Sequence, residues 1–287
     1  MSRKSMSESN ESTKRTGWLV ALCLLVAAAL AVPAVAEPDG RTEAIKPPSK
    51  DHPYPELWSG WHYAAPETQA MQDDDFANPA MAWNEIGSEL WSKVDGKAKK
   101  SCQDCHGDAA KSMKSVGATY PVYFEPEKKL INVENRINLC RKKFMQAKPW
   151  PYESEDMLAM TIYVKNQSRG LPVNVKIDGP AKEFFERGKA FYDQRRGQLD
   201  FACANCHSKY WGQKIRMDTM SQGQSNGFPT YRSEWQKPGS LHRRFISCNT
   251  MVRSQPFPLG SDEYVNLELY LAWRGQGLPV ETPSVRF

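Results

Sequence analysis

The sequence predicts a mainly α-helical protein made of two tandem units of roughly 100 residues, each built around the same short motif. The motif at Cys102–His106 returns at Cys203–His207, 101 residues later, and similar segments precede and follow both copies. No stretch alternates polar and apolar residues for long enough to require a major sheet. With 287 residues, 40% of them hydrophobic, the chain can form one or two cores and is not mainly disordered.

The first 36 residues are expected to be a cleaved export signal. Four basic residues precede an apolar run from Trp18 to Val32, and the small residues Ala34-Val35-Ala36 then supply a cleavage site. The run is shorter than the roughly 20 residues that a spanning helix needs, so cleavage is favoured over a retained anchor. The mature protein would begin at Glu37, without a membrane span, in the oxidising periplasm.

The charge of the chain is nearly balanced. Net charge is +5 for the whole sequence and +3 after removal of the leader. This excess is too small to indicate a nucleic acid partner, so none is expected and any electrostatic docking must be local.

Both copies of the motif read C-x-x-C-H, in which two thiols form thioethers with haem and the following histidine binds the iron. Three disulfides would be the ordinary expectation for the six cysteines of an exported chain, and a zinc or redox pair is the other alternative. No further ligands lie close enough in sequence for zinc. The sequence therefore predicts two covalently bound haem c groups. The attachment residues are Cys102, Cys105 and His106 for the first haem, and Cys203, Cys206 and His207 for the second.

A helix is expected before each motif. Four positions match at the offset of 101, namely Trp83, Gly87, Leu90 and Trp91 in the first unit, and Phe184, Gly188, Phe191 and Tyr192 in the second. Their spacing of i, i+4, i+7 and i+8 is helical, and the glycine would let another helix approach closely.

A second helix is expected at the end of each unit. Residues 163–173 and 270–280 share a Tyr, a Gly and Leu-Pro-Val at an offset of 107. Capping residues at 155–156 and 261–262 mark the helix starts, and Gly170 and Gly277 mark their stops. Each unit thus reads as helix, motif, long irregular haem-wrapping loop and helix, which is the layout of a class I cytochrome c.

The predicted domains are therefore 37–175 with the first haem and 176–287 with the second, joined by a linker at 174–180. Residues 37–75 are rich in proline and polar residues. We expect them to form an extended arm packed on the first unit, with plain disorder as the alternative.

The remaining iron ligand is indicated by a second repeat. Arg136 precedes Cys140 and Arg244 precedes Cys248 in the same R-x-x-x-C pattern, whereas the methionines share no such context. A disulfide between these two cysteines would need Cα atoms about 4.4–6.8 Å apart, although they belong to separate haem crevices. An axial thiolate on each iron is favoured; it lowers the reduction potential, and the arginine could neutralise its charge.

These residues resemble the SoxA family, the dihaem cytochrome subunits of SoxAX L-cysteine S-thiosulfotransferases. The resemblance covers nearly all of the mature chain. It is carried by the two motifs with their R-x-x-x-C partners and by the stretch from Ser221-Gln222-Gly223 through Asn226–Arg232 to Leu241–Arg244 and Cys248-Asn249.

The resemblance implies oxidative conjugation of thiosulfate to a cysteine of the carrier SoxYZ, yielding a cysteine S-thiosulfonate and two electrons. It implies that Cys248 is the distal ligand of the second haem and the catalytic sulfur, often a persulfide, opposite His207. Arg244 would hold the substrate, and His106 and Cys140 would ligate a first, electron-relaying haem. The implied partners are the monohaem cytochrome SoxX, in a heterodimer, and a downstream cytochrome c that accepts electrons.

Two alternatives remain for the function and one for the arginine. A tetrathionate-forming thiosulfate dehydrogenase would be expected to pair its His/Cys haem with a Met-ligated one, and a plain dihaem carrier would want two ordinary ligands. Thiosulfate is a dianion with acceptor oxygens, which suits the planar donor fork of a guanidinium. Arg243 could exchange roles with Arg244 and serve a haem propionate instead.

Overall fold

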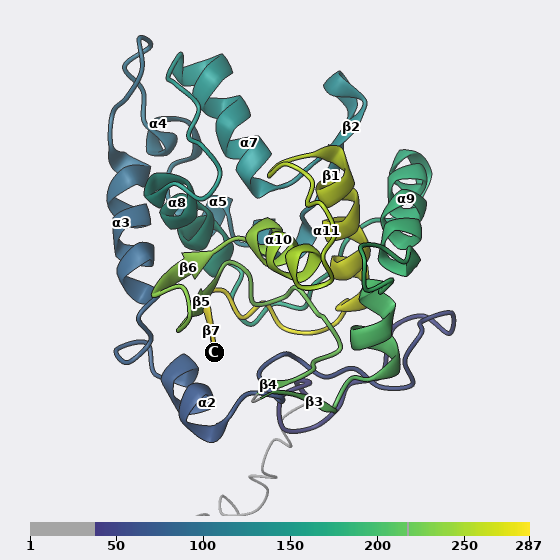
Figure 1. The fold of residues 1–287 in the computed structure, drawn as a ribbon. Coiled ribbons are helices and arrows are strands. Elements are labelled where there is room, and N and C mark those ends of the chain that lie inside the picture. The colour runs from purple at the N-terminus through teal and green to yellow at the C-terminus, as the bar shows by residue number, and fades with distance from the viewer. Residues whose placement is uncertain (1–37, 217) are drawn as a thin grey trace, which may run out of the picture. The chain divides into compact units, whose positions relative to one another are not determined.

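Helices make up most of the regular structure in the computed structural model, which describes residues 38–216 and 218–287 (Figure 1). The expected leader lies outside the described residues. The helices are α2 (Pro66–Asp73), α3 (Met81–Ser92), α4 (Cys102–His106), α5 (Ala109–Ser112), α6 (Val116–Thr119), α7 (Val133–Cys140), α8 (Glu155–Asn166), α9 (Lys182–Asp193), α10 (Leu241–Met251) and α11 (Asp262–Arg274). One π-helical turn, Arg141–Met145, directly follows α7. Another, Asn205–Lys209, begins within the second motif.

The strands are short. β1 (Val122–Phe124) pairs antiparallel with β2 (Lys129–Ile131), and β3 (Lys214–Ile215) with β4 (Asp218–Thr219). In a third sheet, β5 (Thr230–Arg232) lies between antiparallel β6 (Lys237–Gly239) and parallel β7 (Ser284–Arg286), with Tyr231 opposite Val285. The mainly α prediction is confirmed. Among the described residues, no helix has the length and apolar character needed to cross a membrane.

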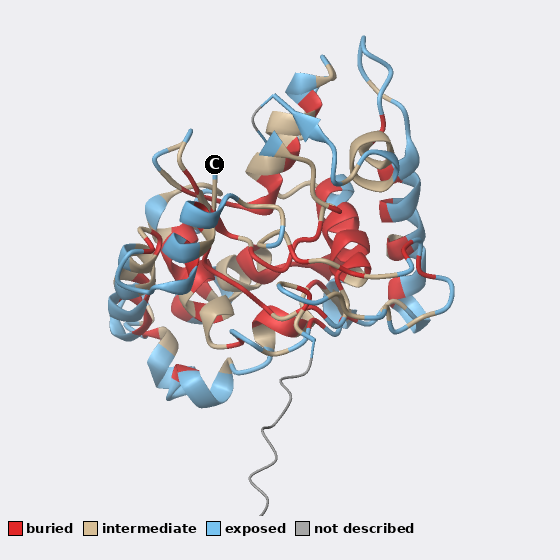
Figure 2. Ribbon diagram, turned by 90° about the horizontal axis from the view of Figure 1, so that it is seen from below, coloured by how far each residue is buried: buried red, intermediate tan, exposed pale blue. Residues whose placement is uncertain are grey.

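The predicted close helix contacts are present in both units. Figure 2 shows buried residues gathered toward the inside of the fold and exposed residues along its outer faces. α3 packs on α8, and α9 packs on α11. A Cβ atom at Gly87 would lie 2.3 Å from the Ala159 carbonyl oxygen, and one at Gly188 would lie 2.1 Å from that of Asn266. Only glycine permits these backbones to approach so closely.

The predicted starts of the closing helices are confirmed, whereas their ends fall earlier than expected. Ser154 caps α8 and Ser261 caps α11, each accepting a hydrogen bond from a backbone N–H of the first turn. α8 ends at Asn166 and α11 at Arg274, each a few residues before the glycine. Gly170 and Gly277 have φ values of +82° and +94° in the turns that follow. They shape the turn that leaves each helix, where the left-handed conformation favours glycine.

The two Leu-Pro-Val segments pair with each other. The backbone N–H groups of Gly170 and Val173 donate to the carbonyls of Val280 and Leu278, both at 2.9 Å. Two reciprocal bonds at 2.9 Å complete an antiparallel contact centred on Pro172 and Pro279. The repeated sequence therefore forms the junction between the halves.

The prediction that the arm packs on the first unit is wrong. Tyr54 and Leu57 are buried with Leu278 in a small apolar cluster, and the Tyr54 hydroxyl donates to the carbonyl of His207. The backbone N–H of Trp58 donates to the side chain of Gln222 at 2.9 Å. The apolar residues of the arm thus find their partners on the second half.

A buried acidic pair lies where α7 meets α10 and α11. His242 Nδ1 accepts the N–H of Gly260 at 3.0 Å, so its other nitrogen carries the proton that faces Glu268 Oε2 at 3.2 Å. Burial, and then the Glu268 carboxylate, raises the pKa of Glu134 to about 7, against the smaller opposing effects of His242 and Lys165. Burial would raise the pKa of Glu268, but the His242 ring that faces its carboxylate at 3.2 Å holds it below its usual value. One proton on Glu134 relieves the repulsion between the carboxylates.

Glu134→Gln should therefore stabilise the protein at alkaline pH. The folded state favours protonated Glu134, so this group's contribution to stability is present below its ordinary pKa of 4.5 and is lost as pH rises through about 7. Denaturant midpoints should show a gain on the order of 1–2 kcal/mol at pH 8 that vanishes near pH 4. Exposed Glu89→Gln is the control, and a pH-independent difference for Glu134→Gln would contradict the assignment.

Candidate functional site

Each motif faces a third cysteine from another helix. In the first, burial raises the pKa of the Cys102 thiol to about 11, and the nearby Cys140 thiol at the end of α7 adds to this shift. In the second, burial raises the pKa of Cys203, and Cys248 of α10 adds to it. All six thiols of the described residues are free of disulfides. Cys140 and Cys248 therefore lie at their own motifs and not against each other.

His207 is held in the orientation that iron ligation needs. Its Nδ1 lies 2.9 Å from the carbonyl oxygen of Ser221, and because a carbonyl only accepts, Nδ1 must carry the proton. Nε2 then keeps its lone pair. Burial, with smaller contributions from Arg244 and Arg274, lowers the pKa of His207 to about 4. The ring is thus neutral at pH 7.

His106 of the first motif has a more open setting. Its pKa is lowered by burial first and by Arg136 second. The Trp91 ring lies 5.8 Å away, and its indole N–H donates to the carbonyl of Gly107 at 3.0 Å. An aromatic wall therefore stands beside the first histidine.

The donor set fits a haem c at each motif. Two thiols and an imidazole come from one or two helical turns, and a third thiol comes from a separate helix. This set supplies two thioether positions and two axial ligands. Among the described residues, no group of three or more His, Cys, Asp or Glu side chains is arranged to hold a metal ion directly.

The R-x-x-x-C pairs lie one helical turn apart, as predicted. Arg136 and Cys140 belong to α7, and Arg244 and Cys248 to α10. Arg136 lies over the Phe124 ring at 5.4 Å and counteracts the burial that raises the pKa of Cys140. The two arginines thus share spacing but differ in their surroundings.

The geometry separates Arg244 from Arg243. Arg243 lies over the Trp235 ring at 4.3 Å, with Nη1 3.7 Å from Glu153 Oε2. Arg244 Nη1 lies 4.0 Å from Glu234 Oε1. The same oxygen accepts a hydrogen bond from Arg232 Nε at 3.0 Å. Two guanidinium groups therefore converge on one carboxylate oxygen, near the second motif.

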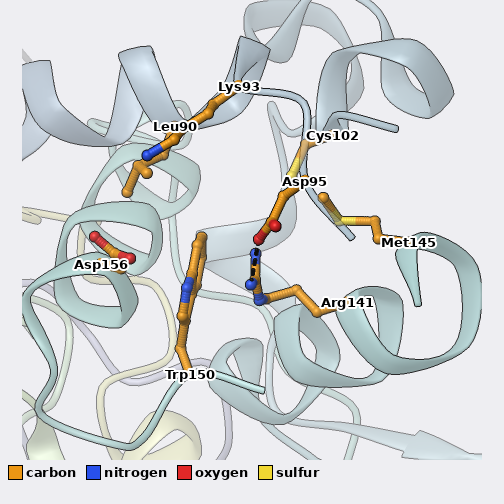
Figure 3. A pocket seen from close by; sticks show the side chains of 8 residues that line it. All are labelled: Leu90, Lys93, Asp95, Cys102, Arg141, Met145, Trp150 and Asp156. Atoms are coloured by element: carbon orange, nitrogen blue, oxygen red, sulfur yellow. Dashed lines mark hydrogen bonds and ion pairs between the residues drawn. The ribbon is translucent and has the colours of Figure 1, made fainter. Parts of the chain in front are cut away.

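Sequence reasoning did not place the residues that hold these groups. Ser221 and Gly223 support the His207 ring, and Arg232 and Glu234 come from the β5–β6 hairpin. Near the first motif, the Arg141 guanidinium meets the Asp95 carboxylate at 2.6 Å beside Cys102 (Figure 3). Ser221–Gly223 and Arg232 lie in the stretch that carries the family resemblance, but a lone sequence gives no signal for their contacts.

The chain is similar to known proteins over most of its length. Residues 86–173 match the family model described as SoxA/TsdA, cytochrome c domain. The chain is 46% identical to the L-cysteine S-thiosulfotransferase subunit SoxA of Pseudaminobacter salicylatoxidans over 85% of each chain. It is 43% identical to that of Rhodovulum sulfidophilum over 94% of this chain and 98% of the relative. The crystal structure of SoxXA from P. pantotrophus superposes with a TM-score of 0.79, at 41% identity over 82% of this chain and 88% of the other.

Gly223→Ala should disturb the second site. Gly223 has φ of +77°, and a Cβ there would lie 2.9 Å from Cγ of His207. We expect a loss of stability of about 2 kcal/mol or more from strain and overpacking together. The displaced ring should also shift one haem spectrum toward the high-spin form.

Gly212→Ala is the control. Gly212 also has a positive φ, +80°, but a Cβ there would meet open space, so the variant introduces backbone strain without a clash. It should cost about 1–2 kcal/mol and leave the haem spectra unchanged. Equal spectral effects in the two variants would show that Gly223 does not support His207.

Proposed function

Because the chain belongs to the SoxA family, we propose that it conjugates thiosulfate oxidatively to a cysteine of the carrier protein SoxYZ, as an L-cysteine S-thiosulfotransferase and c-type cytochrome. The observation that carries the proposal is Cys248, a free thiol that faces the second motif one helical turn after Arg244. In the overall reaction, the carrier thiolate and thiosulfate form one S–S bond and release two electrons.

Cys248 divides this reaction into two steps. Its sulfur bonds to the sulfane sulfur of thiosulfate with loss of two electrons. The carrier thiolate then attacks that sulfane sulfur, and Cys248 leaves as a thiolate or, where it carries an extra sulfur, as a persulfide. Haem c, when bound, accepts the electrons. The exchange depends on the thiolate character of the leaving sulfur.

Arg244 and Arg232 supply the positive charge that thiosulfate requires. Glu234, whose side chain is 51% exposed, is the anion between them. Burial and the neighbouring Arg244 lower the pKa of Arg232, which shows how crowded these two charges are. A dianion that displaces Glu234 would relieve this repulsion and gain bidentate hydrogen bonds. Arg243 is already engaged by Glu153 and Trp235, which supports Arg244 as the substrate residue.

We assign two haems to the chain. His106 and Cys140 would ligate the first iron and His207 and Cys248 the second, with thioethers to Cys102, Cys105, Cys203 and Cys206. The free thiols beside each motif and the fixed tautomer of His207 support this assignment. In this proposal the domains are 37–175 and 176–287, tandem cytochrome c units with haem-wrapping loops.

The proposed setting is the periplasm, reached through the leader at 1–36. The similarity to the SoxXA structure supports a monohaem cytochrome SoxX as the bound partner. A downstream cytochrome c would receive the electrons. The matching R-x-x-x-C helices in both halves favour this function over the tetrathionate-forming and carrier alternatives.

Cys248→Ser should abolish thiosulfate conjugation, because a hydroxyl cannot exchange with a sulfane sulfur. Intact mass should still show two attached haems, since attachment uses Cys203 and Cys206, and should lose any extra sulfur at position 248. Ser247→Ala is the matched control, because that hydroxyl donates only to the Arg243 carbonyl of its own helix at 3.2 Å. Substantial turnover in Cys248→Ser would place the chemistry at another residue.

Arg244→Ala should lower the single-turnover rate by about two to three orders of magnitude, the range for loss of one preorganised electrostatic contact. Arg244→Lys keeps the charge without the planar fork and should retain part of the rate. Arg136→Ala, with the same spacing in the first half, is the control. Equal losses for Arg136→Ala and Arg244→Ala would show that both arginines are structural.

Cys140→Met should raise the reduction potential of the first haem, because a thioether donates less charge to iron than a thiolate. Potentiometric titration should show one haem shifted and the other unchanged. Single-turnover thiosulfate chemistry at Cys248 should be partly retained, since only electron relay is changed. An unchanged first-haem spectrum would remove Cys140 from the ligand set.

A further inference from the structure

The two motifs are flanked by loops with the same backbone. Residues 95–100 and 196–201 each close a small hairpin, through the bridges Asp95–Lys100 and Arg196–Phe201. Their glycines, Gly96 and Gly197, have φ of +72° and +71°. Each packs against a carbonyl after the third cysteine, that of Met145 or that of Val252.

In each loop, the side chain just before the glycine bonds to a residue that follows the third cysteine. In the first loop this side chain is the acceptor, and in the second it is the donor. Asp95 Oδ2 lies 2.6 Å from Arg141 Nη2, and Arg196 Nη1 donates to Asn249 Oδ1 at 2.9 Å. The loops are therefore fixed in the same way in both halves. Differences among their outward side chains are not required by the fold.

Those outward side chains differ sharply. Six exposed lysines surround the first motif, and we call them the lysine face: Lys93, Lys97, Lys99, Lys100, Lys142 and Lys143. Segments 93–104 and 141–148 together hold eight basic and two acidic residues. The matching segments 194–205 and 249–256 hold three basic residues and one acidic residue. The two segments at the first motif therefore carry a net charge of +6. Because the mature chain as a whole has a net charge of +3, its remaining residues have a net charge of −3. The positive charge of the mature protein is thus concentrated there.

The two acidic residues of these segments are already engaged. Asp95 pairs with buried Arg141, and the Asp104 carboxylate accepts the N–H of Ser101 at 2.7 Å as a helix cap. Among the described residues, no lysine of this face forms an ion pair within 4.0 Å. The lysine that does so is Lys129, which lies outside the face. Lys142 and Lys143 also help to lower the pKa of Glu127, but its carboxylate is paired with Lys129 at 2.8 Å. The face therefore keeps a net positive charge.

Two apolar side chains are exposed beside these lysines. Val94 is 59% exposed and Phe144 is 50% exposed, with the Lys143 amine 5.6 Å from the Phe144 ring. Cys105, an attachment residue of the first motif, is also exposed. Charged side chains around a few apolar ones, at the edge of a redox centre, suit a transient protein contact that forms rapidly.

We propose that the lysine face binds an acidic one-electron redox protein and is where electrons leave the first haem. This inference rests on the proposed function, which gives that haem an electron-relaying role. Each encounter moves one electron from the reduced iron to the acceptor. A redox protein is favoured over an anionic lipid surface because the lysines surround the attachment motif, and because only two apolar side chains are available to enter a membrane.

The test uses the complete heterodimer with Lys97, Lys99 and Lys142 changed to Glu. Lys176, Lys182 and Lys189, exposed on and before α9, are changed to Glu as the matched control. Oxidation of the reduced protein is followed at the haem bands, with ferricyanide as an anionic oxidant and tris(phenanthroline)cobalt(III) as a cationic one. The first-haem phase is identified as the one that Cys140→Met alters.

At low ionic strength, the lysine-face variant should be oxidised at least about tenfold more slowly by ferricyanide and faster by the cobalt complex, with both differences lost at high salt. Calorimetry with flavodoxin, a small acidic flavoprotein, should show binding to the wild type and the control but not to the lysine-face variant. Single-turnover thiosulfate chemistry should be unchanged, which separates this inference from the proposed function.

Two results would overturn the inference. Equal oxidation rates in the lysine-face and control variants would show that electrons do not leave at this face. Binding of the wild type to phosphatidylglycerol vesicles, lost in the lysine-face variant while flavodoxin fails to bind the wild type, would assign the face to a membrane.

Discussion

The structure depends on the pairing of two copies of one short sequence. Four backbone hydrogen bonds of 2.9 Å join residues 170–173 to 277–280. Each segment directly follows a closing helix, so this contact sets α8 and α11 relative to each other. Because α3 packs on α8 and α9 on α11 through glycine contacts, the helices before both motifs follow from the same junction. A duplicated chain can thus join its halves through a surface that is its own complement.

The same scaffold nevertheless supports two different sites. Both third cysteines lie one turn after an arginine, but the cysteine follows the histidine by 34 residues in the first half and by 41 in the second. In the second half this segment carries the β5–β6 hairpin, which brings Arg232 and Glu234 to Arg244. In the first half, Arg136 meets the Phe124 ring instead. A hairpin precedes the arginine helix in both halves, β1–β2 in the first and β5–β6 in the second. The two sites therefore differ through the side chains of these hairpins, Phe124 in one and Arg232 in the other, and not through the R-x-x-x-C repeat.

Sequence reasoning succeeded where a local constraint determines the structure. Gly87 and Gly188 could be assigned to helix crossings, because a glycine within a helical run of aromatic residues leaves room for a second backbone on the buried face. A disulfide between Cys140 and Cys248 was judged unfavourable because the two cysteines follow separate motifs, and both thiols are free. The arm was misplaced because the partners of Tyr54 lie about 150 to 220 residues away, and no local pattern encodes such contacts. Arg232 could not be placed beside Arg244 for the same reason, because the two meet only through the hairpin.

The arm also shows how the second site is kept in place. Arg274 is 1% exposed, and its guanidinium donates to the Tyr54 hydroxyl, which in turn donates to the His207 carbonyl. The Tyr192 ring, 4.3 Å from the guanidinium, offsets part of the cost of burying that charge. A charge buried this deeply is tolerated only while its partners stay in place. Loss of the arm would therefore leave Arg274 without Tyr54 and release the backbone of His207, so a segment about 150 residues before the second motif helps to fix it.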